Sequence, residues 1–141
     1  MEGPVQRIEL IEYYYTVVPN RVGEGAKVFN VLKVQHVNLL AFNGFPLSAQ
    51  RTQLDLVPSS GAALIAAAKK AGIKLVGPKV AFLISEWEHL GAVADILGKL
   101  AQAGVNVTAM QAIETGDWRY GAILWVKPSN ISKAAQALGI T

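Results

Sequence analysis

Two short loops contain the residues of this sequence that are best suited to binding a small molecule. They are Asn20-Arg21-Val22-Gly23 and Glu88-His89-Leu90-Gly91, and each precedes a segment with the apolar spacing of a helix. Free N–H groups at a helix N-terminus, together with the helix dipole, attract a carboxylate, and a glycine lets a ligand approach the backbone closely. The chemistry expected at these loops is therefore the binding of a small carboxylate-bearing ligand.

An asparagine follows each of the two predicted helices. Asn38 and Asn106 open the next strand, and Val107 comes directly after the second of them. A side-chain amide both donates and accepts hydrogen bonds, which suits a ligand that carries an ammonium and a carboxylate group. Glycine also serves simply to form tight turns, and asparagine to satisfy a turn backbone, so a purely structural role stays open for these residues.

No arrangement of residues typical of catalysis accompanies the loops. The two histidines, His36 and His89, lie in different halves of the chain, and the sequence contains no cysteine. Neither the His-Glu-x-x-His pattern of zinc enzymes nor the Gly-x-x-x-x-Gly-Lys pattern of phosphate loops occurs. The sequence therefore predicts a protein that is not an enzyme and that uses no metal and no cofactor.

The two loops occupy equivalent places in an internal repeat. The segment Val22–Asn38 recurs 68 residues later (90 − 22) as Leu90–Asn106. The residues that are identical at this spacing are Gly23/Gly91, Ala26/Ala94, Leu32/Leu100, Val37/Val105, Asn38/Asn106, Ala41/Ala109 and Arg51/Arg119. A repeat of this length indicates that one fold unit is used twice.

The residue patterns predict the same order of elements in both halves. In the first half we expect a strand at 12–18, a helix from 22, a strand at 37–42, a turn at 43–46, a strand at 51–57, a helix at 62–71 after a cap at 58–60, and a strand at 74–77. After Pro78 we expect a strand at 80–85, a helix at 90–100, strands at 105–113 and 119–126 around a turn at 116–117, and a helix from 131 capped by 128–130.

The second half lacks a final strand, whereas the first half is preceded by an extra one. Residues Val5–Leu10 are apolar enough to pair, and a sheet with an unfilled place would leave an exposed edge. We therefore predict two domains, residues 12–77 and residues 79–141 with the N-terminal strand 5–10. The first domain is then inserted in the second.

The composition limits the partners that can be expected. Hydrophobic residues make up 52% of the chain and charged residues only 16%, against about 25% charged in ordinary soluble domains. The surplus apolar surface predicts a homodimer or a higher homo-oligomer. The basic residues are scattered, which argues against nucleic-acid binding. Apolar runs are too short for a membrane span, which needs about 20 residues, and the absence of cysteine and of a secretory signal favours the cytoplasm.

The order β-α-β-β-α-β is the ferredoxin-like arrangement, and the residues of the second half point to one family within it. The segment His89–Val107 resembles the first helix and second strand of the ACT domain, whose pattern is Pro-Gly-x-Leu at the helix start and Leu-x-x-x-Gly-x-Asn-Ile at its exit. The first half resembles the pattern through Val22-Gly23 and Val37-Asn38. Val22 and Leu90 replace the proline, and His36 replaces the glycine at the helix exit.

This resemblance implies an α+β protein of two ACT-type domains side by side, with antiparallel sheets and the helices on one face. It also implies a free-standing regulatory protein that binds an amino acid or a related metabolite at an interface between ACT domains. The corresponding ligand-binding residues are Asn20, Arg21, Val22, Gly23, Asn38, Glu88, His89, Leu90, Gly91, Asn106 and Val107. The departures from the pattern leave an alternative open, a structural dimerisation module whose ligand site has degenerated.

Overall fold

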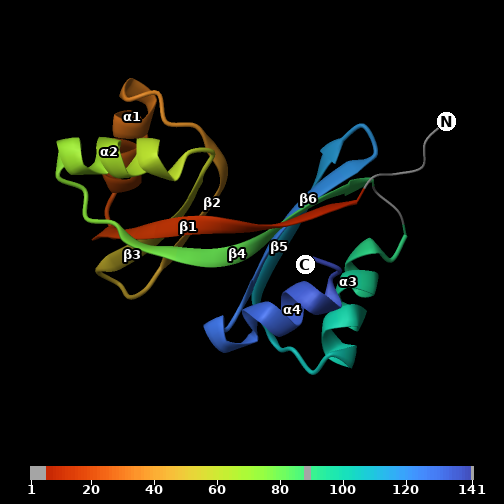
Figure 1. The fold of residues 1–141 in the computed structure, drawn as a ribbon. Coiled ribbons are helices and arrows are strands. Elements are labelled where there is room, and N and C mark those ends of the chain that lie inside the picture. The colour runs from red at the N-terminus through yellow and green to blue at the C-terminus, as the bar shows by residue number, and fades with distance from the viewer. Residues whose placement is uncertain (1–5, 88–89, 141) are drawn as a thin grey trace. The chain divides into compact units, whose positions relative to one another are not determined.

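The computed structural model of the chain describes residues 6–87 and 90–140, and it has an α+β fold (Figure 1). The strands are β1 Arg7–Pro19, β2 Leu39–Pro46, β3 Arg51–Pro58, β4 Val76–Trp87, β5 Val107–Gly116 and β6 Arg119–Val126. The helices are α1 Glu24–Val34, α2 Gly61–Ala71, α3 Ala92–Gln102 and α4 Ile131–Ala137, with a short 3-10 helix, η1, at Pro128–Asn130.

The strands are ordered β2-β3-β1-β4-β6-β5, so β2 and β5 are the edge strands. The pairs β1–β3, β2–β3, β4–β6 and β5–β6 are antiparallel. The contacts between residues divide the chain into two compact units. The first unit is Glu12–Lys79, and the second unit consists of residues 6–11 with the described residues from Val80 onward. The long strands β1 and β4 each contribute to both units.

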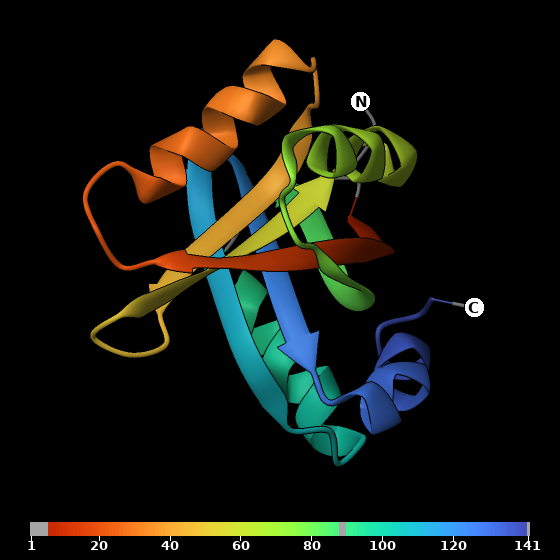
Figure 2. The same ribbon diagram turned by 90° about the vertical axis from the view of Figure 1, so that its left-hand side faces the viewer.

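The core of the first unit lies between its two helices and one face of its strands. Val28 and Leu32, one helical turn apart on α1, meet Leu64 of α2 and the alternating residues Leu54 and Leu56 of β3. These five side chains are at most 6% exposed. In Figure 2, α1 and α2 run next to each other across the strands, and residues of the two helices contact each other. Periodicities of four and of two residues thus place both elements against one core.

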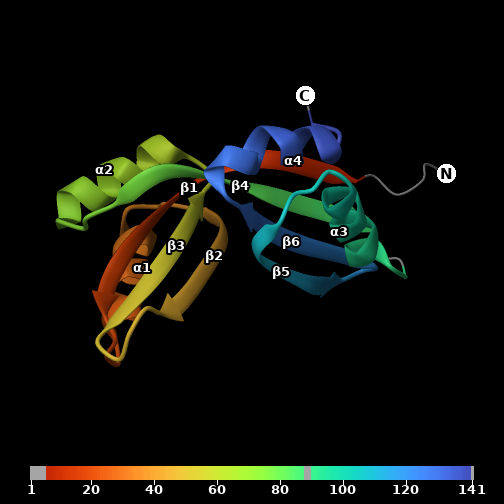
Figure 3. The same ribbon diagram turned by 90° about the horizontal axis from the view of Figure 1, so that it is seen from below.

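The second unit repeats this construction with its own residues. Ile96 and Leu100 of α3 occupy the places of Val28 and Leu32, and they pack with Ala134 of α4 and with Phe82 and Leu124 of the strands. Figure 3 shows α3 and α4 on the same face of the strands β4, β5 and β6. Each buried leucine of this kind contributes about 1.5–3 kcal/mol through removal of its side chain from water.

Two predicted strand boundaries are absent from the structure. The separate strands expected on either side of Ile11 form one strand, β1, over the described residues, and β4 continues through Pro78, where a boundary was expected. A proline removes one ladder hydrogen bond, and a strand that keeps its other bonds on both sides need not end there. Pro78 therefore lies next to the change of unit without ending the strand.

The turn predicted at residues 43–46 was wrong, because these residues belong to β2. Asn43 pairs with Asp55 and Pro46 with Thr52 of β3. The chain reverses instead at residues 47–50, where the Ser48 hydroxyl accepts hydrogen bonds from the N–H groups of Gln50 and Arg51, both at 3.2 Å. A serine side chain that replaces a backbone acceptor stabilises a turn without asparagine, glycine or proline.

A cap was predicted for the second helix of each unit, α2 and α4, and the structure contains only the first of these two caps. Ser60 caps α2 as predicted, since its Oγ accepts the N–H of Ala63 at 3.2 Å. The segment expected to cap the last helix instead forms η1, and Asn130 makes no side-chain cap hydrogen bond to α4. Proline at the first position favours a helical turn, so the residues start the helix early rather than capping it.

Candidate ligand site

The first loop leads into α1 through a glycine with a left-handed backbone. Gly23 has φ +89°, and its carbonyl accepts the first helical hydrogen bond from the N–H of Lys27 at 3.1 Å. A φ in this range is unfavourable for residues with a Cβ. Val22, next to it, is fully exposed, although valine is normally buried. The loop therefore presents an apolar side chain and a bare backbone at the helix start.

Two of the predicted ligand-binding side chains in this loop already have partners in the chain. The Asn20 side-chain amide donates to the Ala49 carbonyl at 3.3 Å, and its backbone N–H donates to the Gln50 carbonyl at 2.8 Å. The Arg21 guanidinium lies 3.3 Å from the carboxylate of Glu24. Asn20 thus joins the loop to the β2–β3 turn, and Arg21 forms an exposed ion pair of the kind that contributes at most about 1 kcal/mol.

The second loop also ends in a glycine with a left-handed backbone. Gly91 has φ +81° and precedes α3, and its carbonyl accepts the N–H of Asp95 at 2.9 Å. Leu90 is fully exposed, as Val22 is at the equivalent place. Glu88 and His89, which were also predicted to bind the ligand, lie outside the described residues.

The starts of α1 and α3 differ from the start of α2 in their capping. Ser60 supplies a side-chain acceptor to α2, whereas Gly23 and Gly91 provide no side-chain cap hydrogen bond. The N-terminal N–H groups of a helix need an acceptor from a side chain, from water or from a ligand. At the start of α1 the N–H of Glu24 donates to the Arg21 carbonyl at 3.3 Å, and neither glycine cap offers a side-chain acceptor to the N–H groups that follow it.

The two predicted asparagines lie at the other end of the same helices. Asn38 and Asn106 are exposed and stand directly before β2 and β5, and Val107 is the first residue of β5. The Asn38 carbonyl accepts the N–H and the hydroxyl of Ser59 at 2.9 and 3.2 Å. These bonds use the backbone of Asn38 and leave its side-chain amide out of the turn.

The structure does not bring the loop and the asparagine of one unit together. Helix α1 is 11 residues long, which is about 16 Å at 1.5 Å per residue, and it separates Gly23 from Asn38. Helix α3, also 11 residues long, separates Gly91 from Asn106 in the same way. A small ligand cannot touch both groups within one unit.

The helix exits show why the change from glycine to histidine is tolerated. The N–H groups of His36 and Val37 donate to Lys33 and Leu32 at 3.1 and 2.8 Å, and Gly104 and Val105 repeat both bonds at 3.0 and 2.9 Å. His36 takes a left-handed φ of +57° and Gly104 one of +72°. The fold therefore imposes the same helix end on both residues, with strain at the histidine.

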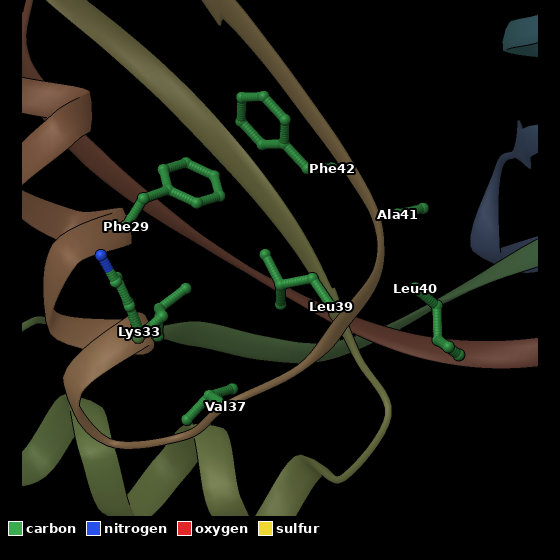
Figure 4. Close-up of a pocket in the computed structure, with 8 residues that line it drawn as sticks. Phe29, Lys33, Val37, Leu39, Leu40, Ala41 and Phe42 are labelled. Atoms are coloured by element: carbon green, nitrogen blue, oxygen red, sulfur yellow. The ribbon is translucent and has the colours of Figure 1, made fainter.

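An apolar groove of about 370 Å³ lies beside Asn38 in the first unit. The edge strand β2 and α1 form its walls, and the rings of Phe29 and Phe42 meet edge to face at 4.6 Å (Figure 4). The lining residues are Phe29, Leu32, Lys33, Val37, Leu39, Leu40, Ala41 and Phe42. The site prediction missed this groove, although the unbroken apolar run 39–42 is a signal that both faces of this strand are apolar.

A buried carboxylate is a further polar feature of the first unit. Asp55 on β3 is 5% exposed, and its Oδ1 accepts a hydrogen bond from the Gln53 amide at 2.9 Å. Burial raises the pKa of Asp55, while the bond from Gln53 and the charge of Lys79 oppose the rise. The Lys79 ammonium also lies 5.4 Å from the centre of the Tyr15 ring. Asp55 is thus a buried carboxyl group with a nearby amide donor and a nearby positive charge, and no second carboxylate is among these groups.

Metal and membrane sites are also absent from the part of the chain that the structure describes. Within residues 6–87 and 90–140, no three side chains of His, Asp or Glu gather in a way that could hold a metal ion. No helix within the same ranges has the length and apolar character needed to cross a membrane.

Comparison with known proteins relates the chain to others through its structure alone. No protein-family model and no curated protein sequence matches the chain. Protein BT0572 from Bacteroides thetaiotaomicron has a similar structure, with a TM-score of 0.79, 22% identity, and coverage of 93% of this chain and 88% of that one.

Two further similar structures are regulatory parts of aspartate kinase. The ligand-free regulatory subunit from Thermus thermophilus matches with a TM-score of 0.61 and 15% identity, over 97% of this chain and 95% of that one. A putative C-terminal regulatory domain from Porphyromonas gingivalis matches with a TM-score of 0.53 and 15% identity, over 95% and 94% of the two chains. Likenesses at this level of identity define the fold and leave the ligand open.

The fold that the chain shares with these structures is of the ACT type. The chain has the ACT-type fold predicted from His89–Val107, and it shares this fold with the regulatory subunits of aspartate kinase over nearly its whole length.

Proposed function

We propose that the protein is a regulatory protein that binds an amino acid or a related metabolite and performs no catalysis. The observation that carries the proposal is the repeated start of α1 and α3, a left-handed glycine without a side-chain cap beside a fully exposed apolar residue. Such a start suits the carboxylate of a ligand. The similar structures named as regulatory subunits support the regulatory role.

We propose two ACT-like domains, residues 12–77 and residues 79–141 with the N-terminal strand 5–10. The two compact units, which divide between Lys79 and Val80, support this arrangement. The hydrogen bond from the Gln6 amide to Glu86 at 2.9 Å supports the assignment of the N-terminal segment to the second domain.

The ligand site is proposed to form between two copies of the chain. One copy supplies a loop that ends at Gly23 or Gly91, and the second copy supplies a strand-opening asparagine, Asn38 or Asn106. The length of the helix between these groups supports this division, because no single unit can offer both to one ligand.

A homodimer is the assembly that this site requires. Large apolar side chains that remain exposed support it, since contiguous exposed apolar surface usually marks an interface. Those in the first unit are Val17, Val22, Val34, Leu40, Phe42, Leu47, Ile65 and Val76, and those in the second are Leu10, Leu90, Leu97, Ile113 and Trp118.

A thermal-shift screen of the full chain against the proteinogenic amino acids at millimolar concentration tests the proposal. A ligand at 100 times its Kd stabilises the folded protein by about 2.7 kcal/mol. The variant Asn106→Ala should abolish the shift, whereas Asn30→Ala, on the exposed side of α1, should leave it unchanged. An unchanged melting temperature with every amino acid contradicts the proposal.

A structural dimerisation module is the second candidate, and the first loop favours it. The internal partners of Asn20 and Arg21 occupy side chains that a ligand would need. This candidate predicts a dimer whose mass in light scattering, and whose melting temperature, do not respond to any metabolite.

A further inference from the structure

A polar pocket lies in the second unit, away from the strand-opening Asn106. Its volume is about 520 Å³, and it is bounded by Gln6, by the end of β4 and by one side of α3. The residues that matter for its chemistry are Gln6, Glu86, Asp95, Gly98 and Lys99. No described residue of the proposed loop site lines it.

Glu86 forms the buried wall of this pocket and is only 7% exposed. It follows Phe82 and Ile84 at two-residue spacing on β4, so it ends a stripe of side chains that otherwise builds the apolar core. Its Oε2 accepts hydrogen bonds from the Gln6 amide at 2.9 Å and from the Tyr120 hydroxyl at 2.8 Å. A carboxylate at this depth is stabilised by such bonds, and it places an acidic group at the wall of the pocket.

The environment of Tyr120 is consistent with a negatively charged pocket. Burial raises the pKa of the Tyr120 phenol, and the hydrogen bond to Glu86 and the negative charges of Glu86 and Asp95 raise it further. The tyrosine therefore stays a neutral donor to Glu86 at physiological pH.

The α3 side of the pocket carries one negative and one positive side chain, Asp95 and Lys99, with Gly98 between them in the sequence. Asp95 and Lys99 are exposed, and they form no ion pair with each other among the described residues. Gly98 stands between them in the helix interior, where a Cβ would meet no atom within 4 Å. Glycine is the least favourable helix residue after proline, and no close contact requires it here. Its effect is to keep the side of the pocket open.

The first unit contains no counterpart of this pocket chemistry. At the repeat spacing of 68 residues, Val18 stands for Glu86 (86 − 68), Lys27 for Asp95 and Asn30 for Gly98. The buried acid, the rim acid and the glycine gap therefore occur together only in the second half of the sequence.

We propose that this pocket binds a small zwitterionic metabolite, with its ammonium group between Glu86 and Asp95 and its carboxylate at Lys99. Two acidic side chains and one basic side chain favour a ligand whose ammonium group makes the main contact. The amide of Gln6 at the same wall can accept a further hydrogen bond from the ammonium group. The site goes beyond the proposed function, because it requires neither the glycine loops nor a second copy of the chain.

Calorimetric titration of the full chain with three matched compounds tests the proposal. 5-Aminopentanoate carries both charged groups, pentylamine only the ammonium and pentanoate only the carboxylate. We expect 5-aminopentanoate to bind most tightly, pentylamine more weakly, and pentanoate not at all. Binding of pentanoate as tightly as 5-aminopentanoate would overturn the assignment of the ammonium group to Glu86 and Asp95.

Exposed variants locate the binding without risk to the core. Asp95→Asn should weaken binding of 5-aminopentanoate roughly tenfold or more, the usual effect of losing one hydrogen bond to a charged group. Gly98→Leu should abolish binding by filling the gap. Glu114→Gln, which removes an exposed carboxylate elsewhere, and Asn30→Leu, at the equivalent place in α1, are the matched controls.

The results separate this pocket from the loop site. Binding that Asn106→Ala abolishes and that Asp95→Asn and Gly98→Leu leave unchanged would refute the pocket and support the loops. The opposite pattern would support the pocket, and the loop site would then be decided by the amino-acid screen alone. If no compound binds the wild-type chain at millimolar concentration, the pocket proposal is wrong whatever the outcome of the amino-acid screen.

Discussion

Helices α1 and α3 occupy the same place in the two units, and their surroundings differ in an instructive way. Both begin at a left-handed glycine and both end in the same pair of backbone hydrogen bonds. The residue in the left-handed exit position is His36 in one helix and Gly104 in the other. The backbone hydrogen bonds have thus been kept in both units while the side chains around them changed. The side chains therefore decide what each unit can bind.

The largest effect that tests this equivalence is expected in the two cores. Leu32 and Leu100 lie 68 residues apart and are 3% and 0% exposed. Leu32→Ala and Leu100→Ala should each lower the free energy of unfolding by about 2–5 kcal/mol, because each leaves a cavity. Denaturant titration measures both losses, with Leu→Met at each position as the control of similar volume. A loss below about 1 kcal/mol at either position would show that the two cores are not equivalent.

Smaller losses should distinguish the three helix starts. Gly23→Ala and Gly91→Ala should each cost about 1–2 kcal/mol, since both positions hold the left-handed conformation. Ser60→Ala should cost about 1 kcal/mol through loss of the cap to Ala63. Thermal unfolding in the presence and absence of a bound ligand should further distinguish the glycine variants from Ser60→Ala. Only the glycine variants should also change a ligand-induced shift at the loops.

Exchange of the helix-exit residues should move stability in opposite directions. His36→Gly should stabilise the protein by about 0.5–1 kcal/mol, because it relieves the left-handed strain at a helix end that is already formed. Gly104→His should destabilise it by a similar amount or more. The midpoint of denaturant unfolding measures both changes. A loss of stability in His36→Gly would mean that the histidine makes a contact whose value exceeds its strain.

The smallest effect concerns pH and the first unit alone. Burial raises the pKa of Asp55 above its usual 3.8, so the folded state binds this proton more tightly than the unfolded state does. The contribution of Asp55 to stability is therefore lost as pH rises from about the usual value through the higher folded pKa. Asp55→Asn should melt above the wild type at neutral pH, and the difference should shrink toward acid pH. A difference that is constant with pH would contradict this origin.

Sequence patterns predicted the features that depend on neighbouring residues. The helical spacing of apolar residues from Val22 to Leu32, and from Leu90 to Leu100, identified both helices, and Ser60 identified a cap. The buried sides followed only in part, because Leu32 and Leu100 are buried whereas Val22 and Leu90, at the starts of the same patterns, are fully exposed. The continuity of β4 through Pro78 could not be predicted in this way, because it depends on strands that lie elsewhere in the chain. The same holds for residues 43–46, which pair with β3 in spite of their turn-like composition.

The candidate site was predictable only in its backbone elements. The positions of Gly23 and Gly91 before helices followed from the repeat. The partners of Asn20 could not be foreseen, because the Ala49 carbonyl comes from a distant turn whose conformation is set by Ser48. The burial of Glu86 was hidden for a similar reason, since Tyr120 and Gln6 approach it from 34 and 80 residues away in the sequence.

The bond between Gln6 and Glu86 also bears on how the chain folds as it leaves the ribosome. The first unit is contiguous and can collapse once residue 79 has emerged. The start of β1 must wait for partners that are made 80 residues later, of order 10 s at typical rates of translation. During that interval an apolar strand has an unsatisfied edge, so the nascent protein is most vulnerable to association with other chains before its second half is complete.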